Sequence, residues 1–283
     1  MSTQKNILLT GANGFIGSYF QKTYGEKYNI KTFSFLNDDI KTLDLSNTDT
    51  IIHLSALVHQ MGGATKEEYH KVNVENTLRL AKKAQEAGVK HFIFMSSIKV
   101  YGEESEEIYN ETTECLPQDD YGISKLNAEK ALQKLETNDF IVSIIRTPIV
   151  YGEGVKANIL SLVKLVKKVP ILPFYNTNNR RSMVYIGNLS AMIDTIIIQK
   201  SSGVFLASDD KTLSTSEFIK LIAKINNKNI TLLPIPFFKV LLKKVKPSFY
   251  KRLYMSLEVN NEHTKKRLNF TNPYTIEEGL NDI

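Results

Sequence analysis

The first half of the chain alternates short apolar runs with longer segments of helical period. The apolar runs predict strands at 6–9, 30–35, 50–54, 91–95 and 140–145. Helical spacing of apolar residues predicts helices at 15–24, 66–88 and 124–135. Strands that alternate with helices favour right-handed crossovers and a mainly parallel sheet. The pattern therefore predicts an α/β fold with a doubly wound parallel sheet.

The pattern changes character after Val150. Glycine and proline punctuation, the polar stretch 176–179 and the pair Pro234 and Pro236 predict smaller elements packed over the sheet. The apolar stripe within 159–166 has helical spacing, which predicts either core or a helix over a cleft. We expect two regions, 1–150 and 151–283, within one compact body.

Length and composition bound the class of protein. A chain of 283 residues with 42% hydrophobic and 23% charged residues can bury a sizeable core. Its single cysteine, Cys115, cannot form an intramolecular disulfide, which fits a reducing compartment. Residues 1–6 are polar, and no apolar run approaches the roughly 18 residues of a membrane span. We expect a cytoplasmic protein without stable membrane insertion.

The net charge of +6 is unevenly distributed. Residues 103–120 are acidic, whereas 239–252 is rich in lysine and arginine. A solvated helix face is the favoured interpretation of the basic stretch, and no recognised module accompanies it that would indicate nucleic-acid binding. Peripheral contact with anionic lipid is a further interpretation. The apolar residues beside the lysines are Phe237, Phe238, Leu241 and Leu242.

A glycine-rich loop follows the first predicted strand and opens a helix. It reads TGANGFIG over residues 10–17. Gly11 permits the tight turn, Gly14 lets the backbone approach a pyrophosphate, and Gly17 allows close packing of helix on strand. Because the helix N-terminus offers N–H groups and a partial positive charge, the loop predicts a dinucleotide-binding site.

The acid expected after the second strand is missing. An Asp or Glu there would bind the ribose 2′-hydroxyl of NAD. The sequence has Ser34 at this point, and Asp38 and Asp39 come slightly late. Ser34 is compatible with a 2′-phosphate, but no arginine stands nearby to bind one. The choice between NAD and NADP stays open.

Tyr121 and Lys125 lie four residues apart at the start of a predicted helix and so share a face. The ordinary pKa of tyrosine is about 10, and a neighbouring ammonium favours the phenolate. An ordinary surface pair would have the same spacing. The hydroxyls of Ser96 and Ser97, at the end of the strand 91–95, favour a catalytic site because ligands of doubly wound sheets bind there.

Together these motifs resemble the extended short-chain dehydrogenases, the family of nucleotide-sugar epimerases, dehydratases and reductases. TGANGFIG, MSSIKVYG at 95–102 and YGISK at 121–125 carry the resemblance, which covers nearly the whole chain. It implies a Rossmann domain at 1–150 that also recruits a segment near 183–207, and a mainly substrate-binding region at 151–283. By the same resemblance Ser97 is the hydroxyl partner, Tyr121 the acid/base and Lys125 its activator.

The resemblance also implies the residues around each ligand. For NAD or NADP they are Gly11, Asn13, Gly14, Phe15, Ile16, Gly17, Ser34, Asp44, Leu45, Leu54, Ser55, Ala56, Asn73, Lys125 and Pro148. For the substrate they are His59, Ser97, Asn158 and Arg181. An arginine suits a sugar-nucleotide diphosphate because its fork is planar and permanently charged. The closing segment places Phe270 where tryptophan is common in the family.

Narrower phrases, among them ALVHQM, YGEGVKAN and NRRSMVYIGNL, look most like bacterial 4-reductases. Those enzymes reduce UDP-4-keto-6-deoxy-N-acetylhexosamines to UDP-N-acetylquinovosamine or UDP-N-acetylfucosamine for surface polysaccharides. A UDP-hexose or UDP-N-acetylhexosamine 4-epimerase shares the catalytic residues, and a cofactor-binding sensor without chemistry is a third hypothesis. The resemblance implies a homodimer through a helix pair that includes 124–135. The scattered histidines predict no metal site.

Overall fold

The computed structural model describes residues 4–58, 64–105, 107–155 and 158–283, and its centre is a sheet of six parallel strands. The strand order is β2-β1-β3-β4-β5-β9. The strands are β1 (Asn6–Thr10), β2 (Asn29–Phe33), β3 (Thr50–His53), β4 (His91–Ser97), β5 (Ile141–Thr147) and β9 (Gly203–Leu206). The predicted doubly wound parallel sheet is confirmed.

The order of the sheet reverses at β1. This strand pairs with β2 on one side, Leu8 opposite Lys31, and with β3 on the other, Leu8 opposite Ile51. Connections to the two sides leave on opposite faces, so the loops after β1 and β3 separate and open a crevice at the carboxyl ends of the strands. The fold therefore places the glycine-rich loop at the position where such sheets bind ligands.

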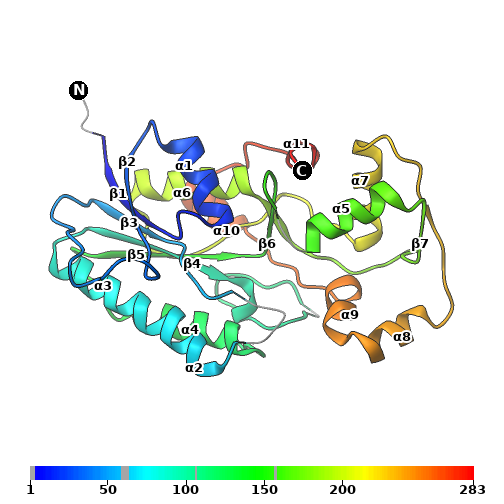
Figure 1. The fold of residues 1–283 in the computed structure, drawn as a ribbon, viewed down its shortest axis with the longest axis horizontal. Helices are drawn as coiled ribbons and strands as arrows, with labels where there is room; N and C mark the ends of the chain where they lie inside the picture. The colour runs from blue at the N-terminus through cyan, green and yellow to red at the C-terminus, as the bar shows by residue number, and fades with distance from the viewer. Residues whose placement is uncertain (1–3, 59–63, 106, 156–157) are drawn as a thin grey trace.

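Helices cover both faces of the sheet (Figure 1). Helices α1 (Phe15–Tyr24) and α6 (Ile186–Gln199) pack on one face, where Phe20 and Ile193 are fully buried. Helices α3 (Asn76–Glu86) and α4 (Asp120–Gln133) pack on the other, where Leu80 and Leu132 are fully buried. Each such side chain contributes roughly 2 kcal/mol by leaving water. α4 is thereby held beside the end of β4.

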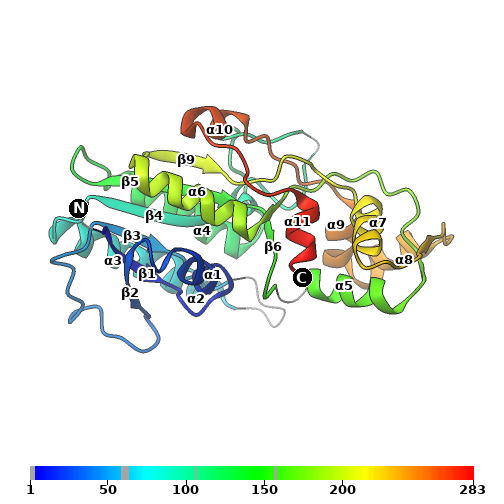
Figure 2. The same ribbon diagram turned by 90° about the horizontal axis from the view of Figure 1, so that it is seen from above.

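A smaller group of elements extends from one end of the sheet (Figure 2). Its helices are α5 (Asn158–Lys168), α7 (Thr215–Ile225), α8 (Phe238–Val245), α9 (Pro247–Tyr254), α10 (Glu262–Leu268) and α11 (Ile276–Asn281), of which α10 lies back against the sheet's helices. Its strands form two parallel pairs, β6 (Ile149–Tyr151) with β8 (Met183–Tyr185) and β7 (Ile171–Leu172) with β10 (Thr231–Leu232). A second apolar core joins α5, α7 and α11.

Two predicted helices differ from those observed. The segment 66–88 is not one α-helix: α2 (Lys66–Tyr69) leads into a π-helical segment, His70–Glu75, and α3 follows. The helix predicted at 124–135 is α4, which begins at Asp120 because the Asp119 carboxylate caps it by accepting from the Gly122 N–H at 2.7 Å.

Residues 203–206, within the segment expected to join the first region, form β9 beside β5, and Ser143 pairs with Gly203. The division of the chain at residue 150 stays a prediction about its domains. In the described parts of the chain, no helix combines the length and apolar character that crossing a membrane requires.

Candidate functional site

The turn after β1 accepts only glycine at its critical positions. Gly11 has φ +71°, and a Cβ there would lie 2.8 Å from the backbone nitrogen of Ser55. A Cβ on Gly17 would lie 2.9 Å from the Cα of Ala12. The Gly14 N–H donates to the Gly11 carbonyl at 2.9 Å and closes the turn. These contacts hold the start of α1 directly against the end of β1.

The N-terminus of α1 is suited to a pyrophosphate. Its N-cap is Gly14, which has no side chain to satisfy the first N–H groups, and no acidic residue lies in the first turn. The helix dipole adds partial positive charge at this point. Asn13 is exposed, and Phe15 and Ile16 are half-buried beside it. The residues present therefore fit the phosphates of NAD or NADP.

A carboxylate reaches the end of β2 from further along the chain. Asp38 accepts a hydrogen bond from the Ser34 N–H through its Oδ2, at 2.7 Å. The negative charge therefore lies beside the first residue after β2, the place where an acid usually meets the adenosine ribose. Asp44 is exposed, and a hydrogen bond from the Ser46 N–H lowers its pKa, whereas Leu45 is buried in the core.

Asn73 fixes the loop that follows β3. Its Nδ2 donates to the Leu57 carbonyl at 3.0 Å and to the Ser124 hydroxyl at 2.9 Å, and its Oδ1 accepts from the Leu57 N–H at 2.8 Å. Ser124 in turn donates to the carbonyl of Tyr121. Both amide hydrogens thus serve contacts within the protein, which indicates a positioning role for Asn73. The nearby Leu54, Ser55 and Ala56 are half-buried.

His53 is a second positioning residue, which sequence reasoning had not assigned to the site. It is buried at the end of β3, with Nδ1 2.7 Å from the Thr10 hydroxyl and Nε2 2.9 Å from the Thr77 hydroxyl. Burial lowers the pKa of His53 to about 3, so the ring is neutral. One ring thereby joins β1, β3 and α3 below the loops of the site.

The proposed catalytic hydroxyls meet at the carboxyl end of β4. Ser97 is the last residue of that strand, and Tyr121 lies in the first turn of α4. Burial raises the pKa of Tyr121 to about 12, and the nearby Ser97 side chain opposes that shift. The ring of Tyr69 packs edge-on at 6.1 Å. The phenol is therefore held in its protonated form.

Lys125 lies one turn after Tyr121 and is buried. Its Nζ donates to the Met95 carbonyl at 2.7 Å and lies 4.4 Å from the centre of the Phe94 ring. Burial lowers the pKa of Lys125 to about 7, against the opposing effect of Glu129. Without a ligand, the protein therefore holds a lysine that gains or loses its charge near neutral pH.

A buried ion pair fixes α4 to the sheet. Arg146 of β5 donates from Nη2 to Glu129 of α4 at 2.6 Å and from Nη1 to the Tyr101 hydroxyl at 2.7 Å. The Ser96 hydroxyl donates to the same glutamate. This network joins β4, β5 and α4 directly behind the site. The sequence offered one signal for it, an arginine directly after the apolar run 140–145.

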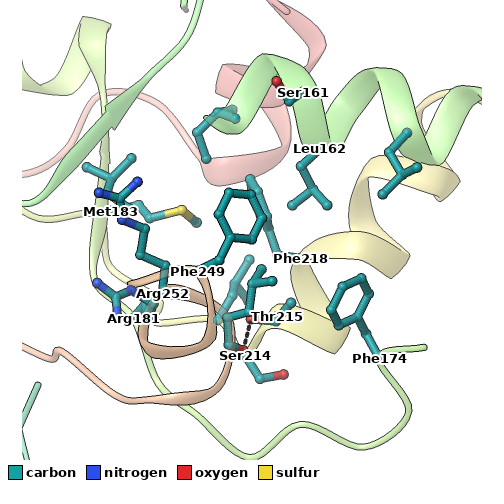
Figure 3. Close-up of a pocket in the computed structure, with 15 residues that line it drawn as sticks. Ser161, Leu162, Phe174, Arg181, Met183, Ser214, Thr215, Phe218, Phe249 and Arg252 are labelled. Carbon is teal, nitrogen blue, oxygen red and sulfur yellow. Dashed lines mark hydrogen bonds between the residues drawn. The ribbon is translucent and has the colours of Figure 1, made fainter. Parts of the chain in front are cut away.

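A largely apolar pocket of about 170 Å³ lies between α5, α7 and α9 (Figure 3). Leu162, Phe174, Phe218 and Phe249 are among the residues that line it. Arg181 and Arg252 line it as well, and in the described residues no carboxylate forms an ion pair with either.

Burial and the neighbouring Arg252 lower the pKa of Arg181 to about 10, against the opposing charge of Glu103. Arg181 also donates to the Met255 carbonyl at 3.0 Å, which fixes its direction. Two guanidinium groups beside an apolar cavity suit a ligand with an anionic part and a flat or apolar part.

Of the remaining residues predicted to line the site, two are buried and two are not fully described by the structure. Pro148 is buried between β5 and β6, and Phe270 is buried in the core on the α6 side of the sheet. Asn158 is the first residue of α5, but its side chain lies outside what the structure describes, and so does the whole of His59.

Comparison with known proteins identifies a family, one similar protein of that family and two solved structures with the same fold. The model of the family described as NAD dependent epimerase/dehydratase matches residues 7–205. UDP-glucose 4-epimerase of Vibrio cholerae is 39% identical over 306 aligned residues, which cover 98% of this chain and 93% of that protein.

Two solved structures share the fold. dTDP-4-dehydrorhamnose reductase of Bacillus anthracis, in complex with NADP, has a TM-score of 0.76 at 22% identity, covering 98% of this chain and 97% of that one. UDP-N-acetylglucosamine 4-epimerase of Bacillus cereus has a TM-score of 0.78 at 18% identity, with the same coverage.

Proposed function

We propose that this chain, which belongs to the NAD dependent epimerase/dehydratase family, reduces the C4 ketone of a nucleotide sugar. The enzymes of this family act on nucleotide sugars and use NAD or NADP. The substrate is a UDP-4-keto-6-deoxy-N-acetylhexosamine, and the product is UDP-N-acetylquinovosamine or UDP-N-acetylfucosamine for surface polysaccharide. The observation that carries the proposal is that Ser97, Tyr121 and Lys125 come together at the end of β4, where Lys125 donates to the Met95 carbonyl.

Reduction of a ketone needs a hydride at carbon and a proton at oxygen. A reduced nicotinamide cofactor supplies the hydride when bound. Tyr121 donates its phenolic proton to the C4 oxygen, so the ketone becomes an alcohol and Tyr121 becomes a phenolate. Ser97 donates a hydrogen bond to the same oxygen, without giving up its proton, and holds that oxygen beside the phenol. The Lys125 ammonium stabilises the phenolate until solvent returns a proton.

The protonation state of Tyr121 suits the step in which the C4 ketone is reduced. Its raised pKa keeps the phenol protonated at neutral pH, and a protonated phenol is the acid that a forming alkoxide needs. The two guanidinium groups of the pocket, Arg181 and Arg252, would bind the diphosphate, and the aromatic lining would cover the uracil ring. A carboxylate at the end of β2, Asp38, favours NAD over NADP.

The 4-epimerase is the second candidate, and the relative at 39% identity favours it. In that reaction Tyr121 accepts the proton of the C4 hydroxyl and later returns it, while oxidised cofactor would take the C4 hydride and give it back to the other face, so no net reductant is used. The two candidates therefore differ in whether reduced cofactor is consumed. A sensor without chemistry would bind cofactor and turn over neither substrate.

The test is incubation of the purified protein with UDP-4-keto-6-deoxy-N-acetylglucosamine and NADH or NADPH, with the product identified by NMR. Stoichiometric oxidation of cofactor and a C4 alcohol are expected. Interconversion of UDP-GlcNAc and UDP-GalNAc without added reductant, and no reaction with the ketone, would replace the reductase with the epimerase. The implied homodimer through residues 124–135 is checked on the same sample by light scattering.

A further inference from the structure

One segment of the chain carries many basic residues and no acidic ones. Residues 218–257 contain no aspartate or glutamate. Their cations are Lys220, Lys224, Lys228, Lys239, Lys243, Lys244, Lys246, Lys251 and Arg252. Because the net charge of the whole chain is +6 and this segment carries +9, the rest of the chain carries −3 by difference. The molecule therefore has a basic end.

The same segment exposes apolar side chains on α8. Phe237 is 84% exposed, Leu241 59% and Val245 66%, and their spacing of four residues puts them on one side of the helix. Val240, also exposed, flanks this stripe. Phe238, by contrast, is half-buried and packs edge-on against Phe174 at 6.1 Å. α8 thus has an inner apolar face that packs on the protein and an outer apolar face that does not.

Lysines border the outer face of α8. Lys239 lies 5.5 Å from the Tyr254 ring and Lys243 5.7 Å from the Tyr250 ring, both on the side toward α9. Lys244 and Lys246 are exposed, and within the described residues neither of them forms an ion pair. Lys251 pairs with Glu104 at 3.2 Å. Several cations are thus available beside exposed phenylalanine, leucine and valine.

We propose that the outer face of α8, with Phe237 and the adjoining lysines, docks this protein on an anionic lipid bilayer. An amphipathic helix with exposed aromatic and aliphatic side chains bordered by lysines inserts its apolar face at the boundary of headgroups and acyl chains. The absence of acids over residues 218–257 matches a negative surface, whereas protein interfaces are poor in lysine. The helix lies in the bilayer surface and does not cross it.

Docking through α8 also brings the apolar pocket close to the membrane surface. α9 follows α8 directly, and its Phe249 and Arg252 line the apolar pocket, so the pocket lies one helix away from the lipid surface (Figures 1 and 3). The proposal does not depend on whether the enzyme is a reductase or an epimerase. Its consequence is that the enzyme works beside a membrane.

The first experiment is sedimentation of the full-length protein with vesicles. Vesicles of pure phosphatidylcholine are compared with vesicles that contain about one third phosphatidylglycerol, an anionic fraction that attracts polybasic segments. Binding to the anionic vesicles is expected, with little binding to the neutral ones and release by high salt because exposed charges are screened.

Variants then separate charge from apolar insertion. The triple variant Lys243→Gln/Lys244→Gln/Lys246→Gln should bind anionic vesicles roughly 100-fold more weakly. Leu241→Ser/Val245→Ser should weaken binding as well. Two matched controls should bind like the parent: Lys71→Gln/Lys211→Gln/Lys266→Gln removes three exposed lysines elsewhere, and Ile198→Ser removes an exposed apolar residue of α6.

The following results would overturn the proposal that α8 docks on a membrane. Equal binding of the parent and both α8 variants would do so, as would equal binding to neutral and anionic vesicles. If the parent instead forms an oligomer that Leu241→Ser/Val245→Ser dissociates, with no vesicle binding, the face is an interface between copies of this chain. Turnover of a soluble substrate should be unchanged in every variant, which separates this test from that of the reaction.

Discussion

At the scale of single residues, the site works by keeping ionisable groups out of water. Tyr121 and Lys125 are neighbours on one helix, and burial favours the neutral form of each. A lysine whose pKa is about 7 without ligand regains its charge when an anionic or polar partner enters. Ligand binding and the acidity of Tyr121 are therefore expected to be coupled through Lys125.

Removal of one hydroxyl tests the proton donor. Tyr121→Phe should lower kcat by roughly 10²- to 10⁴-fold, the usual contribution of a general acid, and leave the Kd of the cofactor unchanged. Tyr109→Phe is the matched control, because that hydroxyl donates to the Glu104 carbonyl outside the site. Steady-state kinetics and calorimetric titration of cofactor are the measurements. Unchanged kcat in Tyr121→Phe would remove Tyr121 from the mechanism.

Asp38 is expected to set the preference between cofactors. Asp38→Asn removes the negative charge beside Ser34, so the ratio of the Kd for NADP to the Kd for NAD should fall about tenfold, or 1.4 kcal/mol. Asp39→Asn is the control, since Asp39 instead accepts from the Lys41 N–H at 2.9 Å. Fluorescence titration of both dinucleotides gives the ratio. An equal change in both variants would contradict a specific role for Asp38.

At the scale of secondary-structure elements, polar side chains fix the position of α4 and of the loops. The buried pair Arg146–Glu129 joins α4 to β5, and Asn73 joins it to the loop after β3. A buried charge that loses its partner is costly, whereas an apolar pair of similar volume is often tolerated. The position of Tyr121 therefore depends on residues that touch neither substrate nor cofactor.

Urea unfolding of variants at the ion pair tests this dependence. Glu129→Met should lower the free energy of unfolding by about 3–5 kcal/mol, because it leaves the Arg146 guanidinium buried without its carboxylate. Glu129→Met/Arg146→Met should recover most of that loss. A double variant as unstable as the single one would mean that packing volume, and not the unpaired charge, dominates.

The neutral His53 makes stability depend on pH. Its pKa is about 3 in the folded protein and about 6.5 when unfolded, so the unfolded chain binds more protons between these values. The contribution is complete above pH 6.5 and is lost as the pH falls toward 3. Between pH 6.5 and 5 the loss should be about 2 kcal/mol. Urea unfolding at pH 6.5 and at pH 5 should show this loss of unfolding free energy in the parent but not in His53→Gln. An equal loss in both proteins would contradict the role of His53.

At the scale of the whole molecule, the periodicity predicted a parallel sheet, five of its six strands and the place of the glycine loop, but it did not predict β9. Runs such as 91–95 are buried on both faces, and Gly11 and Gly17 are fixed by backbone contacts that no other residue fits. The family motifs then predicted Ser97, Tyr121 and Lys125 as catalytic residues, and in the structure Ser97 is close enough to Tyr121 to affect its pKa.

Other features were beyond sequence reasoning because they depend on tertiary contacts. His53 and Glu129 are ordinary polar residues in the sequence, and their roles come from partners far along the chain, Thr77 and Arg146. The arrival of Asp38 at Ser34 depends on a turn that its spacing did not suggest. The outer face of α8 had been interpreted as a solvated helix face, but exposed apolar residues occupy it.

The wide turn at His70–Glu75 sets the rotational phase of the helix on either side of it. A π-helical turn holds one residue more than an α-helical turn, and each residue of a regular helix rotates the next by roughly 100°. Before the turn Tyr69 faces Tyr121, and after it Leu80 faces the sheet. Deleting the exposed Lys71 would restore a regular helix and swing Tyr69 away from the phenol while the sheet kept its cover. The contact between the rings of Tyr69 and Tyr121 therefore depends on a single extra residue in the chain.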